Sequence, residues 1–164
     1  MTVSEFTKLY DDHADAIYRY CFFRLSQNKA LAEDLVQEAY MRTWKAVASG
    51  QQIDNGKTFL FTVAHNLVID TYRKKQTFSL DNLTDAGFSP EDKSNVSPQT
   101  QAEISEMLVH INKLPDNYRQ VILLRFVENL GPKDIAEIVG ESENNVSVRL
   151  NRAITQLKNE MNPE

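Results

Sequence analysis

The sequence predicts an all-α protein with two small helical domains joined by a flexible acidic linker. Glycine is scarce, at 5 of 164 residues, whereas the helix-favouring residues Leu, Ala, Lys, Glu and Gln are frequent. Apolar residues recur three and four positions apart over most of the chain, as on one face of an α-helix. This spacing is lost over residues 77–100, which contain prolines, a glycine, serines and a surplus of acids. We therefore expect domains at residues 1–76 and 101–164.

Three helices are predicted for the N-terminal domain. The first covers residues 4–25, and a short break at residues 26–28 separates it from the second, at residues 29–49. The third covers residues 58–75 and follows a loop that contains an Asn-Gly turn signal. Each helix has an apolar stripe, and in the third helix Phe61 and His65 fall outside that stripe or at its margin.

Two polar surfaces of this domain have both an ordinary and a functional interpretation. One face of the second helix carries Asp34, Gln37 and Glu38, and it is either a solvated face or a contact surface for a protein partner. The third helix ends in a basic run at residues 73–75, which the helix dipole alone would favour. Cations beside aromatic residues and Asn66 also suit single-stranded DNA, whose phosphates need cations and whose unstacked bases need flat partners.

The C-terminal domain is predicted to begin with helices at residues 101–112 and 116–129. Leu114 and Pro115 separate them, because a residue before proline disfavours the helical conformation. A short helix, a turn and a longer helix then follow over residues 132–158. Pro132 suits a first helical position, Gly140 can adopt the positive φ of a helix-ending turn, and Ser142 can cap the longer helix.

The spacing within residues 132–158 is that of a helix-turn-helix. Ala136, Gly140 and Val146 stand at positions 5, 9 and 15 of this unit, as a small residue between the helices, a turn residue and an apolar anchor. Two antiparallel helices of an ordinary bundle are the alternative interpretation of the local pattern. The longer helix carries side chains that can bond base edges or phosphates: Asn144, Asn145, Ser147, Arg149 and Arg152.

The charge of the chain is unevenly distributed. The net charge is −5, of which residues 1–76 carry +1, residues 77–110 carry −5 and residues 111–164 carry −1. Both helical parts are therefore near neutral, with basic residues clustered locally. Neutralisation of phosphates by Lys and Arg supplies most non-specific DNA affinity, so such a protein would bind DNA weakly alone. The balance favours DNA binding that depends on a partner.

Several functional classes are disfavoured. Cys21 is the only cysteine, which excludes an internal disulfide and suggests a reducing, cytoplasmic location. The three histidines are scattered without a cysteine at ligand spacing, so we expect neither a metal site nor a cofactor. No apolar run approaches the ~20 residues that cross a membrane, and the acidic start is unlike a signal peptide. We find no Gly-rich phosphate loop and no nucleophile motif, and therefore do not expect an enzyme.

Three blocks of the sequence resemble, in order and spacing, the bacterial extracytoplasmic-function (ECF) sigma factors, the minimal two-domain members of the sigma-70 family. The blocks are AEDLVQEAYMRTW (residues 32–44), FLFTVAHNLVIDTYRKK (residues 59–75) and LPDNYRQVILLRFVENLGPKDIAEIVGESENNVSVRLNRAITQLK (residues 114–158). They resemble the family's core-polymerase-binding helix, its promoter −10 segment and its −35-reading domain. The likeness covers nearly the whole chain except the linker.

The resemblance implies a sigma factor that directs core RNA polymerase to promoters and opens them without chemistry of its own. It implies that Asp34, Gln37 and Glu38 face the clamp helices of the polymerase β′ subunit, with the β flap as a second polymerase contact. It further implies promoter DNA and an anti-sigma factor as partners, and a linker that threads the polymerase channel.

For the −10 element, the resemblance implies that Asn66 reads a flipped-out base, whose exposed edge can pair with an amide. Phe59 occupies a position where the family usually has Trp, so a flat apolar surface is kept and an indole N–H is lost. Three basic residues would hold phosphates near the melted strand: Arg73, Lys74 and Lys75.

For the −35 element, the resemblance implies that the helix starting near Glu143 enters the major groove. Base edges would be contacted by Asn144, Asn145 and Ser147, and phosphates or a guanine by Arg149 and Arg152. This helix is less basic than is usual in the family, since Ser147 stands where Lys is common. Glu141 and His65 also depart from the pattern, replacing an apolar residue and an Arg. Weak −35 affinity or an unusual −35 sequence is the expected consequence.

A stand-alone helix-turn-helix regulator with an N-terminal sensory or dimerising bundle is the alternative function. It explains the C-terminal half equally well, but it explains neither the DLVQEAY face nor the HNLVIDTYRKK segment. It also requires tight DNA binding without polymerase, which the charge balance disfavours.

Overall fold

The computed structural model describes residues 1–77 and 106–162, and within these ranges the regular secondary structure is entirely helical. The all-α prediction is therefore confirmed for the described residues. The predicted linker lies outside them except for its first residue, Thr77, which ends the third helix. The predicted helix at 101–112 is described from residue 106 onward and is helical to residue 112.

Side-chain caps define the starts of the N-terminal helices. Before α1 (Val3–Arg24), Thr2 forms a capping box: its Oγ1 accepts from the Glu5 amide at 3.1 Å, and the Glu5 carboxylate accepts from the Thr2 amide at 2.7 Å. Asn28 caps α2 (Lys29–Ala48) by accepting from the Leu31 amide at 3.1 Å. In α3 (Gly56–Thr77), the amide of Thr58 donates to Asn55 Oδ1. Prediction and structure agree within two residues at these helix ends.

The helix predicted at residues 116–129 begins at the predicted residue and ends two residues early, and its last turn is not α-helical. It begins as α5 (Asp116–Ile122) and continues as a π-helical turn, η2 (Leu123–Val127). The amide of Glu128 donates to the carbonyl of Leu123 at 3.0 Å, a five-residue step that widens the turn. Asn129 then takes a φ of 60°, which ends the helix. Apolar periodicity does not distinguish an α-turn from a single π-turn, so the sequence did not predict this feature.

The helix-turn-helix begins and turns at the predicted residues, and its longer helix continues three residues beyond the predicted end, to Met161. Pro132 is the first residue of α6 (Pro132–Val139), and Gly140 ends that helix with a φ of 74°, in the left-handed region. Ser142 caps α7 (Glu143–Met161), because its side chain accepts from the Asn145 amide at 3.1 Å. Val146 is fully buried, as expected of the anchor between the two helices.

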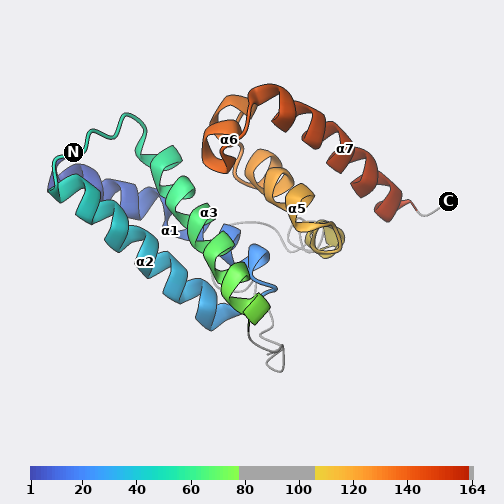
Figure 1. Ribbon diagram of the computed structural model, residues 1–164, viewed down its shortest axis with the longest axis horizontal. Coiled ribbons are helices and arrows are strands. Elements are labelled where there is room, and N and C mark those ends of the chain that lie inside the picture. Colours follow the sequence, from blue (N-terminus) through green and yellow to red (C-terminus); the bar gives the residue numbers. More distant parts are fainter. Residues whose placement is uncertain (78–105, 163–164) are drawn as a thin grey trace.

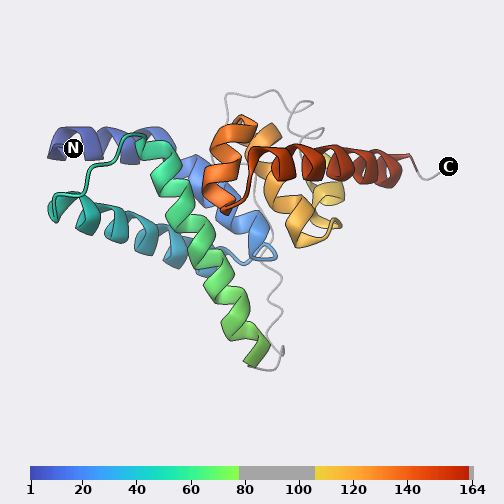
Figure 2. The same cartoon turned by 45° about the horizontal axis from the view of Figure 1, so that its top comes forward.

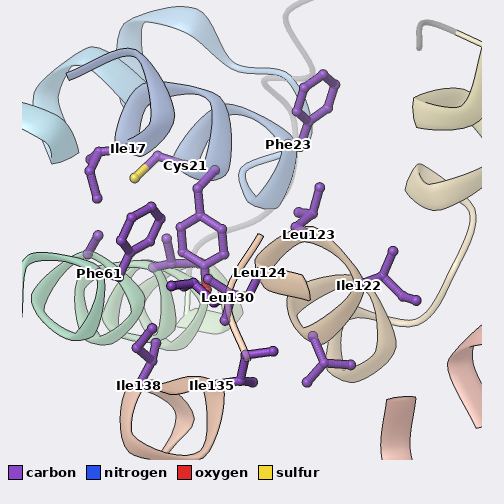
Figure 3. Close-up of a cluster of buried hydrophobic side chains, with 14 of the residues drawn as sticks. Ile17, Cys21, Phe23, Phe61, Ile122, Leu123, Leu124, Leu130, Ile135 and Ile138 are labelled. Atoms are coloured by element: carbon purple, nitrogen blue, oxygen red, sulfur yellow. The ribbon is translucent and has the colours of Figure 1, made fainter. Parts of the chain in front are cut away.

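The two helical parts lie directly against each other. Figures 1 and 2 show α1, α2 and α3 as one bundle and α5, α6 and α7 as a second, with α6 alongside α3. Figure 3 shows Ile135 and Ile138 of α6 below α3, while Ile17 and Cys21 of α1 lie on its other side. All four side chains are at most 2% exposed, so one continuous apolar core extends from the first bundle past α3 to α6 of the second.

This packing corrects the expected position of Phe61, which is fully buried rather than marginal to the core. The prediction considered α3 as a helix with one covered face, but α1, α2 and α6 all pack against it. Phe61 faces α1, where its ring centroid lies 5.6 Å from that of Tyr20. Among the described helices, none has a stretch that is long and apolar enough to cross a membrane.

Candidate nucleic-acid interface

The polar face of α2 is a solvent-accessible surface. Asp34 and Gln37 are exposed, and the half-exposed Glu38 accepts at Oε1 from Arg42 Nε at 2.9 Å, one helical turn later. The opposite face of α2 is anchored in the core by a separate set of residues: Ala32, Leu35 and Ala39. The three predicted partner-contact residues are therefore on one accessible side of a well-anchored helix.

Two apolar side chains extend this surface and were missed by the sequence argument. Met41 is 54% exposed and Trp44 is 39% exposed, although both are large and apolar. Met41 lies four residues after Gln37 and therefore on the same side of the helix. The Trp44 ring packs against Phe6 of α1, with ring centroids 5.1 Å apart. A search for apolar residues at spacings of three and four along the polar face could have found them.

Three of the predicted DNA-contact residues share one stripe of α3. Successive residues of this stripe are seven positions apart, close to two helical turns: Phe59, Asn66 and Arg73. Together they span about 21 Å of helix at 1.5 Å per residue. Asn66 and Arg73 are exposed, and Phe59 is half-buried. An aromatic ring, an amide and a guanidinium therefore follow one another along a single line on the surface.

The C-terminal end of α3 carries the predicted basic cluster. Arg73 and Lys74 are exposed. The Arg73 guanidinium is 4.0 Å from the Asp70 carboxylate, and both side chains are at least half exposed, so this ion pair is weak. Lys75 belongs to α3, but its side chain lies outside the described residues. Arg73 can therefore leave Asp70 and bind a phosphate with little loss of free energy.

The predicted residues of α7 project from its uncovered side. Asn144, Asn145, Ser147 and Arg152 are exposed. The opposite side of α7 is buried against α5 and α6 through Val146, Leu150 and Ala153. Among the predicted residues only Arg149 is partly enclosed: its guanidinium forms an ion pair with Glu141, in the turn before α7. The charge of Arg149 is therefore already compensated by Glu141, and Arg152 is more available to contact DNA.

His65 is held neutral in a buried position beside Asn66. Arg24 Nη1 lies 2.9 Å from His65 Nδ1, and the Tyr20 hydroxyl lies 3.3 Å from the same atom. Since the guanidinium can only donate, Nδ1 accepts and the ring carries its proton on Nε2. Burial, and then the charge of Arg24, lowers the pKa of His65 to about 4. His65 therefore supplies no positive charge to a nucleic acid at neutral pH.

No group of three or more His, Cys, Asp or Glu side chains within residues 1–77 and 106–162 is arranged to hold a metal ion. Cys21 is buried, and burial raises the pKa of its thiol to about 12, which makes it unreactive.

Similarity to known proteins identifies the family. Models of Sigma-70 region 2 and Sigma-70 region 4 match residues 9–78 and 104–157. The chain is 35% identical over 161 residues to the ECF RNA polymerase sigma factor SigM of Bacillus subtilis (strain 168), with 96% of this chain and 94% of SigM covered. The chain belongs to the ECF RNA polymerase sigma factors. It is also 31% identical over 153 residues to SigL of Mycobacterium tuberculosis (strain ATCC 25618 / H37Rv), covering 92% of this chain and 85% of SigL.

Solved structures share the fold of this ECF sigma factor. The sigma factor RpoE from Bartonella quintana, crystallised with the anti-sigma factor NepR, matches with a TM-score of 0.75 at 22% identity, over 97% of this chain and 98% of RpoE. CnrH, solved in complex with the cytosolic domain of CnrY, matches with a TM-score of 0.70 at 19% identity, over 99% of this chain and 91% of CnrH.

The function predicted from sequence is confirmed at the level of the family, since the chain is an RNA polymerase sigma factor of the ECF type. A stand-alone helix-turn-helix regulator does not account for the region 2 match over residues 9–78. The sequence argument missed the charged residues that connect the two helical parts of this sigma factor. These are Arg19 and Arg24 of α1, with their partners Glu128 and Asp116.

Proposed function

We propose that residues 1–76 of this sigma factor bind core RNA polymerase and capture the −10 strand, and that residues 101–164 read the −35 element. In this proposal the α2 surface of Asp34, Gln37 and Glu38 meets the β′ clamp helices, and the C-terminal domain meets the β flap. The protein acts in the cytoplasm as a specificity subunit and catalyses no reaction itself. An anti-sigma factor is a further partner, by analogy with the RpoE–NepR complex.

The observation that carries the −10 assignment is the stripe of Phe59, Asn66 and Arg73 along α3. A base that has left the stack exposes its Watson–Crick edge, and the Asn66 amide offers both a donor and an acceptor to it. The Phe59 ring supports a neighbouring unstacked base. Phosphates on the same strand are held by the basic end of the helix: Arg73, Lys74 and Lys75. A single strand that follows the helix would meet these groups in order.

The −35 assignment is supported by the exposed side of α7. Asn144, Asn145 and Ser147 lie in its first turns, which is the part of a recognition helix that approaches base edges. Arg152 lies about two turns after Asn145 on the same side and contacts phosphate or a guanine. Arg149 contributes to DNA binding only after it leaves Glu141. Few cations act directly, which agrees with a factor that binds DNA as part of the polymerase complex.

Exchange of Asn66 for alanine tests the −10 assignment. Holoenzyme is first used to select promoters from a random library, and opening is then measured by permanganate oxidation of unpaired thymines. We expect Asn66→Ala to reduce opening by about tenfold, since a good base contact contributes about 1–3 kcal/mol, while co-purification with core polymerase is unchanged. Asn159→Ala is the matched control, because Asn159 is an exposed residue near the end of α7. Equal loss of opening and polymerase binding would remove the base-reading role.

A further inference from the structure

An ion pair at the start of α7 joins a carboxylate of the preceding turn to a guanidinium of the helix. Glu141, between α6 and α7, forms this pair through its Oε2 with Nη2 of Arg149. The backbone of the turn is well fixed, since Gly140 has a φ of 74° and the Glu141 amide donates to the Ala136 carbonyl at 3.0 Å. The carboxylate therefore projects from a defined position and meets Arg149 alongside the first turns of α7.

Arg149 lies on the flank of α7, between its covered and its uncovered side. It follows the buried Val146 by three residues and precedes the exposed Arg152 by three, and a step of three residues is about 60° short of a full turn. The major groove of B-DNA is about 12 Å wide, which barely admits a helix with its side chains. A side chain on the flank of a helix in that groove therefore faces the phosphates that line it. Arg149 is placed for a phosphate rather than for a base edge.

Glu141 cancels the charge that this flank would offer to DNA. Residues 141–152 contain two acids, Glu141 and Glu143, and two bases, Arg149 and Arg152, so their net charge is zero. The Glu141 side chain is 32% exposed and that of Arg149 is 19% exposed, so both can be reached from solvent. A phosphate that approaches Arg149 must displace the Glu141 carboxylate, which also repels it. The phosphate and the carboxylate therefore compete for one guanidinium.

The pair is not what holds the turn together. A partly exposed ion pair adds little net stability, because water screens the attraction and both side chains lose rotational freedom. The turn is fixed instead by the conformation of Gly140, the backbone amide of Glu141 and the cap formed by Ser142, none of which uses the Glu141 carboxylate. The carboxylate can therefore leave Arg149 while the helix-turn-helix keeps its shape.

We propose that Glu141 is an internal competitor for DNA phosphate, which withholds Arg149 and so lowers the −35 affinity of the free sigma factor. The inference rests on the proposed function, because it requires α7 to enter the −35 major groove. Phosphate contacts supply a sequence-independent part of DNA affinity, so withholding one guanidinium weakens binding to every sequence. The free factor then occupies little non-specific DNA. In the holoenzyme, polymerase contacts raise the effective concentration of α7 at its site, and a phosphate can displace Glu141 there.

Exchange of Glu141 for glutamine removes the competing charge and nearly preserves side-chain shape. Fluorescence anisotropy titration of the full chain measures its affinity for a −35 duplex selected with holoenzyme and for a scrambled duplex. We expect Glu141→Gln to bind both duplexes about eightfold more tightly at about 0.1 M salt, and the slope of log affinity against log salt to steepen by about 0.9, the contribution of one further phosphate. Glu143→Gln is the matched control, because Glu143 is an exposed acid in the first turn of α7 and lies outside the pair. It should leave the slope unchanged.

Replacement of Arg149 shows whether the gain passes through the ion pair. We expect Glu141→Gln to bring no gain when Arg149→Ala is already present, and the urea midpoint of Glu141→Gln to equal that of the wild-type protein. An unchanged affinity, a gain that persists without Arg149, or an equally steeper slope for Glu143→Gln would overturn the competition. Weaker binding of Glu141→Gln to the selected duplex alone would also overturn it, because Glu141 would then contact a base, as a carboxylate does at the amino group of cytosine.

Arg152→Ala separates failure of this inference from failure of the proposed function. If α7 reads the −35 element, Arg152→Ala weakens binding and lowers the salt slope whatever residue stands at position 141. Weaker binding by Arg152→Ala together with unchanged binding by Glu141→Gln would refute the competition alone. No effect of Arg152→Ala, with no −35 sequence shared among promoters selected by holoenzyme, would refute the −35 assignment and the competition with it.

Discussion

Acidification should weaken the folded state of this sigma factor through His65. Burial and the neighbouring Arg24 lower the pKa of His65 from 6.5 to about 4 in the folded protein. Above pH 6.5 the ring is neutral in both the folded and the unfolded state, so its contribution to stability is fully present. Between pH 6.5 and 4 the unfolded chain binds a proton that the folded chain does not, and stability is lost as the pH falls.

The size of this effect follows from the two pKa values. They differ by about 2.5, and each pKa unit corresponds to about 1.4 kcal/mol, so the full loss is about 3 kcal/mol. At pH 5.0 about 2 kcal/mol of this is already lost. The ring is only 6% exposed, and water therefore screens its surroundings little. Against a typical total stability of about 5–15 kcal/mol, this loss is readily measured.

Urea unfolding followed by circular dichroism at pH 7.5 and pH 5.0 measures the effect. His65→Gln is the comparison, because glutamine keeps an acceptor for Arg24 and does not titrate. We expect wild-type stability to fall by about 2 kcal/mol more than that of the variant between the two pH values. The carboxylates titrate in both proteins and cancel in the difference. The same pH dependence in both proteins would show that His65 is not held neutral by Arg24 and burial.

Three further predictions follow from individual contacts. Arg152→Ala should reduce the slope of log affinity against log salt for a −35 duplex by about one, and Arg149→Ala should reduce it less because Arg149 is paired with Glu141. Fluorescence anisotropy titrations measure the slope, and an unchanged slope for both variants would exclude phosphate contacts by these side chains. Gly140→Ala should destabilise the fold by about 1 kcal/mol, because φ is 74° there while the space around it is open, and an unchanged urea midpoint would contradict this account of the turn. Arg24→Met should lower the free energy of unfolding by about 3 kcal/mol, because it leaves the Asp116 carboxylate unpaired, and adding Asp116→Asn should restore part of that stability. Unaltered stability of the single variant would show that Arg24 and Asp116 are not coupled.

The local features of this fold follow from short stretches of sequence. Pro132, Gly140 and Ser142 each adopt the conformation that their chemistry favours, since a fixed φ, a missing Cβ and a short hydroxyl act within a few residues. The buried faces of α1 and α2 follow from the same three-and-four spacing that places Ile17 and Leu35 in the core. Asn66 is exposed, as a residue that reads DNA must be, but its role came from a family resemblance and stays a prediction.

The contacts between the two helical parts could not be predicted in this way. Arg24 and Asp116 are 92 residues apart, and nothing in the spacing around either residue indicates a partner. His65 is buried beside Tyr20 and Arg24 of α1, so its neutrality depends on neighbours that α3 alone does not specify. The sequence predicted Arg149 as an available cation of a recognition helix, but in the structure Glu141 of the preceding turn forms an ion pair with it. Pairings of this kind depend on tertiary geometry, which binary patterning does not encode.

Co-purification of the pure protein with bacterial core RNA polymerase, followed by transcription from a random promoter library, tests the central claim most directly. We predict a stable complex and initiation from start sites that share new −10 and −35 sequences. Asn66→Ala should then reduce opening of the promoter at the −10 sequence, while the complex with core polymerase still forms. Failure to bind core polymerase, together with retention of duplex DNA by the protein alone, would contradict the proposed division of roles between residues 1–76 and 101–164.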